Sequence, residues 1–92
     1  MDAIEAVGDT RPESGPHPVE VTVNEHPVVV QGPRATGLAI KEAAIAQGLP
    51  IKTDFVLSEE LEHGRTRIVG DSDVVTVTKH SRFDAVAPDD NS

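Results

Sequence analysis

The sequence predicts an α+β fold in a single domain, with one helix packed against a mixed β-sheet. Three observations predict this class. Two valine-rich stretches are separated by a turn, a helix with signals at both ends follows, and several short strands complete the chain. Because 92 residues make at most one small domain, all of these elements have to share one core.

The first two strands are predicted to form a hairpin. In VEVTV, residues 19–23, valine alternates with a polar residue, and this period of two is typical of a half-buried strand. Residues 24–27, NEHP, have the composition of a turn, and Val28 to Val30 return as the second strand. Gly32 and Pro33 then end the hairpin.

A helix is predicted over ATGLAIKEAAIAQGLP. Thr36 is a candidate N-cap, because its hydroxyl can accept a hydrogen bond from an N–H of the first turn. Gly48 stands where a left-handed residue ends a helix, and Pro50 lies just beyond it. The small side chains of Ala43 and Ala44 allow a close approach to a sheet, so we expect both in the core.

Three further strands are predicted after the helix. They cover Asp54–Ser58, Arg65–Val69, and Val74–Lys79, and the alternation of the last allows an extension to Phe83. Gly70–Asp73 is a turn. The order β-β-α-β-β-β, with a long and therefore central last strand, is the β-grasp arrangement. Other arrangements of the same elements stay open at this point.

Most of the net charge of −8 lies at the two ends of the chain. Residues 1–18 and residues 84–92 each carry −3, whereas the long middle part carries only −2. The N-terminal part mixes acids with Gly and Pro and has no periodicity. We therefore predict a disordered acidic segment over residues 1–17, a folded domain over 18–83 and a flexible acidic tail over 84–92.

Composition excludes several functions. The absence of cysteine removes disulfides, thiolate catalysis and thiolate metal sites, and the acidic balance without Trp or Tyr argues against nucleic-acid binding. No apolar run approaches the length of a membrane span or signal peptide, so we expect a cytoplasmic protein. The four histidines lack metal-ligand spacing and the glycines form no phosphate loop. We expect no enzymatic activity, no catalytic residue, no metal site and no cofactor.

The stretch TGLAIKEAAIAQGLPIKTDFVLSEELEHGRTRIVGDSDVVTVTKHSRF, followed by the terminal DDNS, carries a family resemblance. Its most specific pieces are the IKEAAIAQG helix, the DFVL strand, the GD turn before VVTV, the RF pair and the acidic end. From Val19 to Ser92 the chain resembles the prokaryotic ubiquitin-like proteins of the multiubiquitin type. These are encoded in bacterial operons beside E1-like, E2-like and JAB-type peptidase proteins.

The resemblance implies a ubiquitin-like β-grasp fold and a protein modifier that is processed or conjugated through its C-terminal tail. The implied partners are an E1-like activating enzyme, an E2-like enzyme, a JAB-type peptidase and unknown target proteins, with no nucleic acid and no membrane. This kind of operon also implies a role in antiphage defence. The implied conjugation and processing tail is Asp89, Asp90, Asn91 and Ser92, and the implied partner-recognition residues are Arg82 and Phe83.

The tail departs from ubiquitin, which ends in Gly-Gly. Two routes to activation are open: a peptidase trims the tail first, or a basic pocket of the E1-like enzyme accommodates Asp89 and Asp90. Besides the N-terminus, the amines on which chains of the modifier could grow belong to Lys41, Lys52 and Lys79.

Two other classes of function share the predicted fold. In a non-covalent interaction module, an exposed edge or face of the sheet binds a partner, and we expect a sheet-face change such as Val28→Asp to abolish binding. In a sulfur carrier, the terminal carboxylate becomes a thiocarboxylate. That class normally ends in Gly-Gly, so the sequence favours it less.

Overall fold

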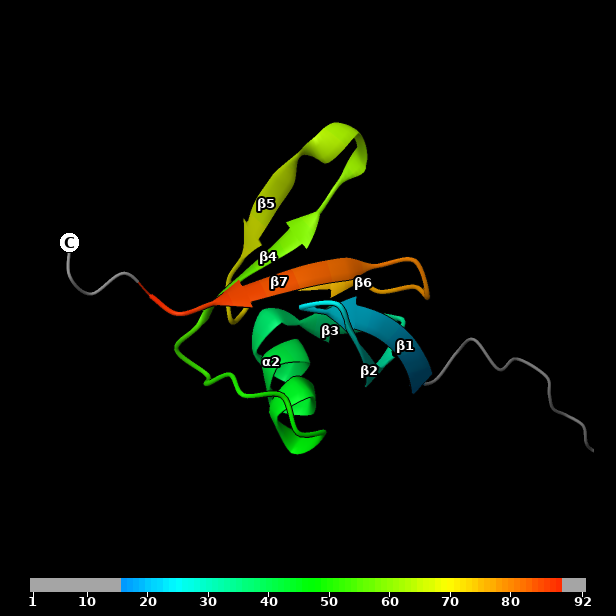
Figure 1. Cartoon of the computed structure of the whole chain (residues 1–92). Coiled ribbons are helices and arrows are strands. Elements are labelled where there is room, and N and C mark those ends of the chain that lie inside the picture. The colour runs from blue at the N-terminus through cyan, green and yellow to red at the C-terminus, as the bar shows by residue number, and fades with distance from the viewer. Residues whose placement is uncertain (1–15, 89–92) are drawn as a thin grey trace, which may run out of the picture.

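The computed structural model describes residues 16–88. Most of the segment predicted as disordered, and the tail residues Asp89 to Ser92, lie outside the described residues. A five-stranded sheet in the order β2-β1-β7-β4-β5 carries the helix α2 on one face (Figure 1). The elements are β1 (His17–Val23), β2 (His26–Gly32), β3 (Arg34–Thr36), α2 (Gly37–Ala46), β4 (Val56–Glu60), the short 3₁₀ helix η2 (Glu62–Gly64), β5 (Thr66–Val69), β6 (Val74–Thr76) and β7 (Arg82–Val86).

The sheet is mixed, because β1 and β7 are parallel while the other neighbouring strands are antiparallel. The predicted α+β class, a β-grasp domain with a mixed sheet and one packed helix, is confirmed. The helix in the described part of the chain is too short to cross a membrane.

The predicted hairpin is formed by β1 and β2. Asn24 and Glu25 make its two-residue turn, and both have positive φ angles, 50° and 68°. Such a turn matches the right-handed twist of the two strands. The alternating valines point into the core, as predicted; the buried ones are Val21, Val23, Val28 and Val30.

Both predicted ends of the helix are confirmed. The N–H of Ala39 donates to Oγ1 of Thr36 at 3.1 Å, which is the N-cap bond. At the other end the N–H of Gly48 donates to the carbonyl of Ile45, and that of Leu49 to the carbonyl of Ala44, both at 3.0 Å. These two bonds form a Schellman motif around Gly48, whose φ is +100°.

The start of α2 is held against the Gly70–Asp73 turn. The N–H groups of Gly37 and Leu38 donate to the carbonyls of Asp73 and Asp71, at 3.0 and 3.1 Å. These bonds satisfy two of the N–H groups that a helix leaves without an intrahelical partner. A Cβ at Gly37 would overlap the carbonyl of Gly70, so this close approach requires glycine.

The last predicted strand, Val74–Lys79 with an extension to Phe83, is in fact two strands. β6 pairs with β3, a strand that we did not predict, in a separate two-stranded sheet, whereas β7 takes the central place. Between them the N–H of Thr78 donates to Oγ of Ser81, and the N–H of Ser81 donates to the carbonyl of Thr78, both at 2.9 Å. These local bonds turn the chain and so interrupt the strand.

The strands extend beyond residues 18–83 at both ends. β1 begins at His17, and β7 continues to Val86. Residues 84–86 were predicted to belong to the flexible tail, yet Ala85 is buried in the core. The reason is the strand alternation, which continues from Phe83 to Ala85 and keeps an apolar side chain on the inner face.

Candidate functional site

The candidate site is the end of β7, because this strand leads into the acidic tail. β7 lies between β1 and β4, and Ala87 and Pro88 follow it. Pro88 has no N–H to donate, so it cannot continue the ladder. Figure 1 shows the start of β1 and the end of β7 on opposite sides of the domain, so β7 ends far from the point where β1 begins.

The side chain of Asn24 holds the end of β7. Its Nδ2 donates to the carbonyl of Ala85 at 3.0 Å, and the N–H of Ala85 donates to its Oδ1 at 2.8 Å. The backbone N–H of Asn24 also donates to the carbonyl of Phe83 at 3.0 Å. Because β1 ends at Val23, this amide takes the place of a strand beside the last residues of β7. Sequence reasoning treated Asn24 only as a turn residue.

The outer sheet face beside the tail is apolar. Val86 is the register partner of Val56 on β4, and both side chains are exposed. Ile68 on β5, which is 66% exposed, adds to the same face. These three side chains form a small exposed apolar group on the outer face of the sheet.

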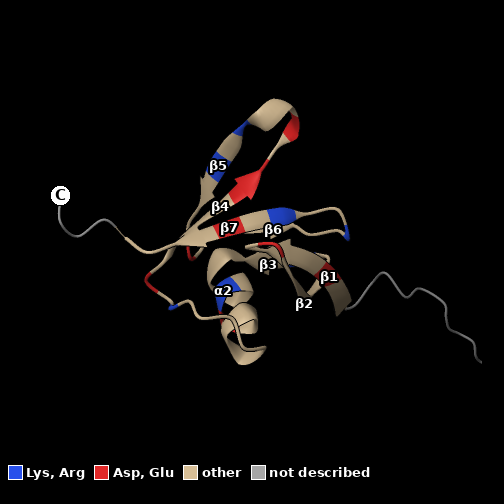
Figure 2. Ribbon diagram, viewed as in Figure 1, with Lys and Arg blue, Asp and Glu red and all other residues tan. Residues whose placement is uncertain are grey.

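Charged side chains lie on the same face of the sheet, closer to the start of β7. Figure 2 shows a basic residue at the start of β7 and an acidic residue at its middle, which are Arg82 and Asp84. Nε of Arg82 lies 3.4 Å from Oε1 of Glu60 on β4, and both side chains are exposed. An exposed pair of this kind contributes little to stability, so Arg82 can exchange its partner at small cost.

The structure separates the two residues expected to recognise a partner. Arg82 is exposed, whereas Phe83 is 1% exposed and is the largest fully buried side chain of the core. A buried ring is not available to a partner, so the expectation for Phe83 is corrected: it anchors β7 in the core. Val28 is also fully buried, so Val28→Asp would disrupt the core rather than test a sheet face.

The three lysines are also in different environments. Lys52 and Lys79 are exposed, but Lys41 is 4% exposed on the inner side of α2. Its Nζ donates to the carbonyls of Thr53 and Phe55 at 2.6 and 2.9 Å. Lys41 is therefore a structural residue and not an accessible amine. Sequence reasoning missed this role, since one lysine in a helix gives no sign of burial.

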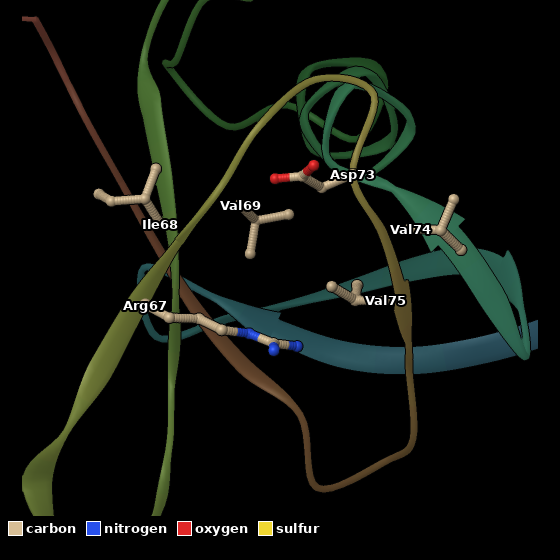
Figure 3. Close-up of a pocket in the computed structure, with 6 residues that line it drawn as sticks. All are labelled: Arg67, Ile68, Val69, Asp73, Val74 and Val75. Atoms are coloured by element: carbon tan, nitrogen blue, oxygen red, sulfur yellow. The ribbon is translucent and has the colours of Figure 1, made fainter.

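Two further features of the described residues are relevant to a site: groups of metal ligands and hollows of the surface. Within residues 16–88, no three His, Asp or Glu side chains gather as metal ligands. A hollow of about 210 Å³ lies between β5 and β6 (Figure 3).

Comparison with known proteins gives one finding. A family model described as multiubiquitin matches residues 19–89, from β1 to the first residue after Pro88. No curated protein and no solved structure matches the chain.

Proposed function

Because the chain belongs to the multiubiquitin family, with its ubiquitin-like β-grasp domain, we propose that it is a bacterial protein modifier. In this proposal an E1-like enzyme and an E2-like enzyme attach it to target proteins through the tail that follows β7. A JAB-type peptidase processes the tail or releases the conjugate. The observation that carries the proposal is the family match over a domain whose central strand leads directly into the tail.

Attachment requires the tail to reach into an enzyme. The tail carboxylate attacks the α-phosphate of ATP, pyrophosphate leaves, and the acyl adenylate passes its acyl group to a thiol with release of AMP. A lysine amine of the target then displaces the thiol and forms an amide. β7 supports this reaction by holding the base of the tail rigidly through Asn24 and Ala85.

The two tail acids, Asp89 and Asp90, bring negative charge next to the phosphates of the nucleotide. Two routes avoid this repulsion: the peptidase removes the last residues before activation, or basic side chains of the E1-like enzyme bind the acids. We propose the bacterial cytoplasm as the setting and antiphage defence as the process, with no catalytic role for the domain itself.

Mass spectrometry of the protein isolated from its native cells through an N-terminal tag tests the proposal. The start of β1 lies at the opposite side of the domain from the end of β7 (Figure 1), so a tag on the N-terminal side is chosen. The expected result is a set of adducts in which Asn91 or Ser92 is joined to another protein. Deleting Asp89–Ser92 is expected to abolish the adducts and leave the fold intact. A chain that stays unattached under every condition would overturn the proposal.

A non-covalent interaction module is the second candidate, and the exposed apolar face of Val56, Ile68 and Val86 favours it. In that case, binding to a partner persists when the tail is deleted. Val86→Asp then abolishes binding, because a charge enters the apolar contact without unfolding the core. The two candidates therefore differ in their response to the same tail deletion.

A further inference from the structure

One outer edge of the sheet is closed to further strands. β2 forms this edge, and the side-chain amide of Gln47 pairs with both backbone groups of Val29. The N–H of Val29 donates to Oε1 at 2.9 Å, and Nε2 donates to the carbonyl of Val29 at 2.8 Å. Pro27, two residues earlier, has no N–H at all. A partner strand therefore finds no free donor at these two positions of β2.

The other outer edge, formed by β5, is open. The N–H of Leu61 donates to the carbonyl of Arg65 at 2.7 Å, so this pair belongs to the hydrogen-bonded positions of the β4–β5 ladder. Hydrogen-bonded and non-hydrogen-bonded pairs alternate along an antiparallel ladder. The backbone groups of Thr66 and Ile68 therefore point away from β4, and no strand among residues 16–88 pairs with them.

A hollow lies beside this open edge. β5 and β6 are joined by the Gly70–Asp73 turn but belong to different sheets, so they diverge and leave a space between them. Figure 3 shows Val69 and Val75 between the two strands, with Ile68 and Val74 at the two sides. Val69 and Val75 are buried, whereas Ile68 and Val74 are 66% and 55% exposed. The side chains of Val69 and Val75 thus form an apolar floor, while those of Ile68 and Val74 point away from the hollow (Figure 3).

The charges at the two ends of the hollow differ. Figure 3 shows the guanidinium of Arg67 at one end and the carboxylate of Asp73 at the other. Oδ2 of Asp73 already accepts the N–H of Gly70 at 2.8 Å. Arg67 uses Nε and Nη2 on one oxygen of Glu59, at 3.1 and 2.9 Å, and an arginine has five donors. Arg67 therefore keeps donors for a further carboxylate.

We propose that the hollow between β5 and β6 binds an extended acidic peptide segment of a partner protein. The segment adds as a strand to the free edge of β5, through the backbone groups of Thr66 and Ile68. One of its apolar side chains packs on Val69 and Val75, and a carboxylate two residues away, on the same face of the added strand, binds Arg67. The site goes beyond the proposed modifier function, since it requires no conjugation. A partner segment whose carboxylate lies opposite Arg67 fits better than a second copy, because two whole copies, each with a net charge of −8, repel each other.

Titration of the ¹⁵N-labelled full chain with a short acetylated peptide tests the site. In this peptide, Val-Ser-Glu-Ser-Val, Val and Glu alternate on one face and are separated by Ser. The expected result is a saturable shift of the amide resonances of Thr66 and Ile68, with smaller shifts at Val74. The matched peptide with Lys in place of Glu is expected to bind at least about fivefold more weakly, since it meets Arg67 with like charge. No shift, equal shifts with both peptides, or shifts confined to β2 would overturn the proposal.

Two variants distinguish strand addition at the β5 edge from nonspecific electrostatic attraction between the peptide and the domain. Ile68→Pro removes the outward N–H of β5 without removing a ladder bond, and it is expected to abolish binding while core resonances stay in place. Arg67→Gln keeps the edge and is expected to weaken binding of the Glu peptide about fivefold. Arg82→Gln is the matched control, because Arg82 is similarly exposed and also pairs with a glutamate. Equal weakening by Arg67→Gln and Arg82→Gln would contradict a specific site.

Discussion

Nζ of Lys41 lies 2.7 Å from Oδ1 of Asp71, although the lysine side chain is 5% exposed and that of the aspartate is 57% exposed. The same ammonium donates to the carbonyls of Thr53 and Phe55. An ammonium has three N–H donors, so all of them are used. Lys41 thereby joins α2 to the loop before β4 and to the turn between β5 and β6.

We expect Lys41→Met to lower the free energy of unfolding by about 2 to 4 kcal/mol, because the two carbonyls lose their buried donor. Asp71→Asn is expected to cost less than about 1 kcal/mol, since that side chain is largely solvated. Urea unfolding measures both changes. Lys79→Met, at an exposed lysine, is the control and is expected to have no effect. Equal stability of Lys41→Met and the unchanged chain would show that these contacts do not stabilise the fold.

The same burial predicts which amines react. Lys52 and Lys79 are expected to be acetylated quickly by an amine-reactive ester in the folded protein, and Lys41 slowly. In urea all three lysines are expected to react at similar rates, which serves as the control. Peptide mass spectrometry measures the rates. If chains of the modifier form on the protein itself, Lys52→Arg together with Lys79→Arg is expected to remove their lysine linkages. A linkage at Lys41 of the folded protein would contradict this assignment.

The end of β7 is expected to depend on Asn24. Asn24→Gly removes both bonds to Ala85 but tolerates the φ of 50°, and it is expected to cost about 1 to 2 kcal/mol. Asn24→Ala adds the strain of a left-handed conformation and is expected to cost about 1 kcal/mol more. Hydrogen exchange reports the local effect, as faster exchange of the Ala85 amide in both variants.

Glu25→Gly is the control for Asn24. Glu25 occupies the next turn position with a φ of 68°, and glycine suits this conformation without strain. We expect this change to raise stability by about 0.5 to 1 kcal/mol and to leave exchange at Ala85 no faster. If Glu25→Gly speeds that exchange as much as Asn24→Gly does, the turn as a whole holds β7, and the Asn24 amide does not.

Local sequence signals were sufficient for the hairpin, the helix ends and the fold class. Each of these signals acts over a few neighbouring residues, so a short stretch of sequence is enough to identify it. The signals are the alternation of residues 19–23, the Thr36 cap and Gly48. The split between β6 and β7 was not predicted, because a Thr and a Ser in an alternating stretch also fit a strand. The hydrogen bonds between Thr78 and Ser81 turn the chain there and prevent a continuous strand.

The candidate sites were predicted less well, since they depend on residues far apart in the sequence. Asn24 and Ala85 are separated by 61 positions, and no periodicity connects them. Lys41 occupies the buried stripe of α2 only because carbonyl groups of a later loop accept its protons. The tail residues Asp89 to Ser92 came from the family resemblance, and they lie outside the described residues.

Gln47 is expected to keep the β2 edge closed. In Gln47→Ala both backbone groups of Val29 lose their partner, so the Val29 amide is expected to exchange with solvent markedly faster. The loss of two exposed hydrogen bonds is expected to cost only about 1 kcal/mol, which leaves the domain folded.

The freed edge of β2 is then expected to bind the peptide that contains Glu and Val, because strand addition requires unpaired backbone groups. The amide resonance of Val29 is expected to shift in Gln47→Ala and not in the unchanged chain. Gln31→Ala is the matched control, since this exposed glutamine on the same strand makes no hydrogen bond through its side chain among the described residues. Slow exchange at Val29 in Gln47→Ala would mean that neighbouring side chains, and not the amide of Gln47, shield this edge.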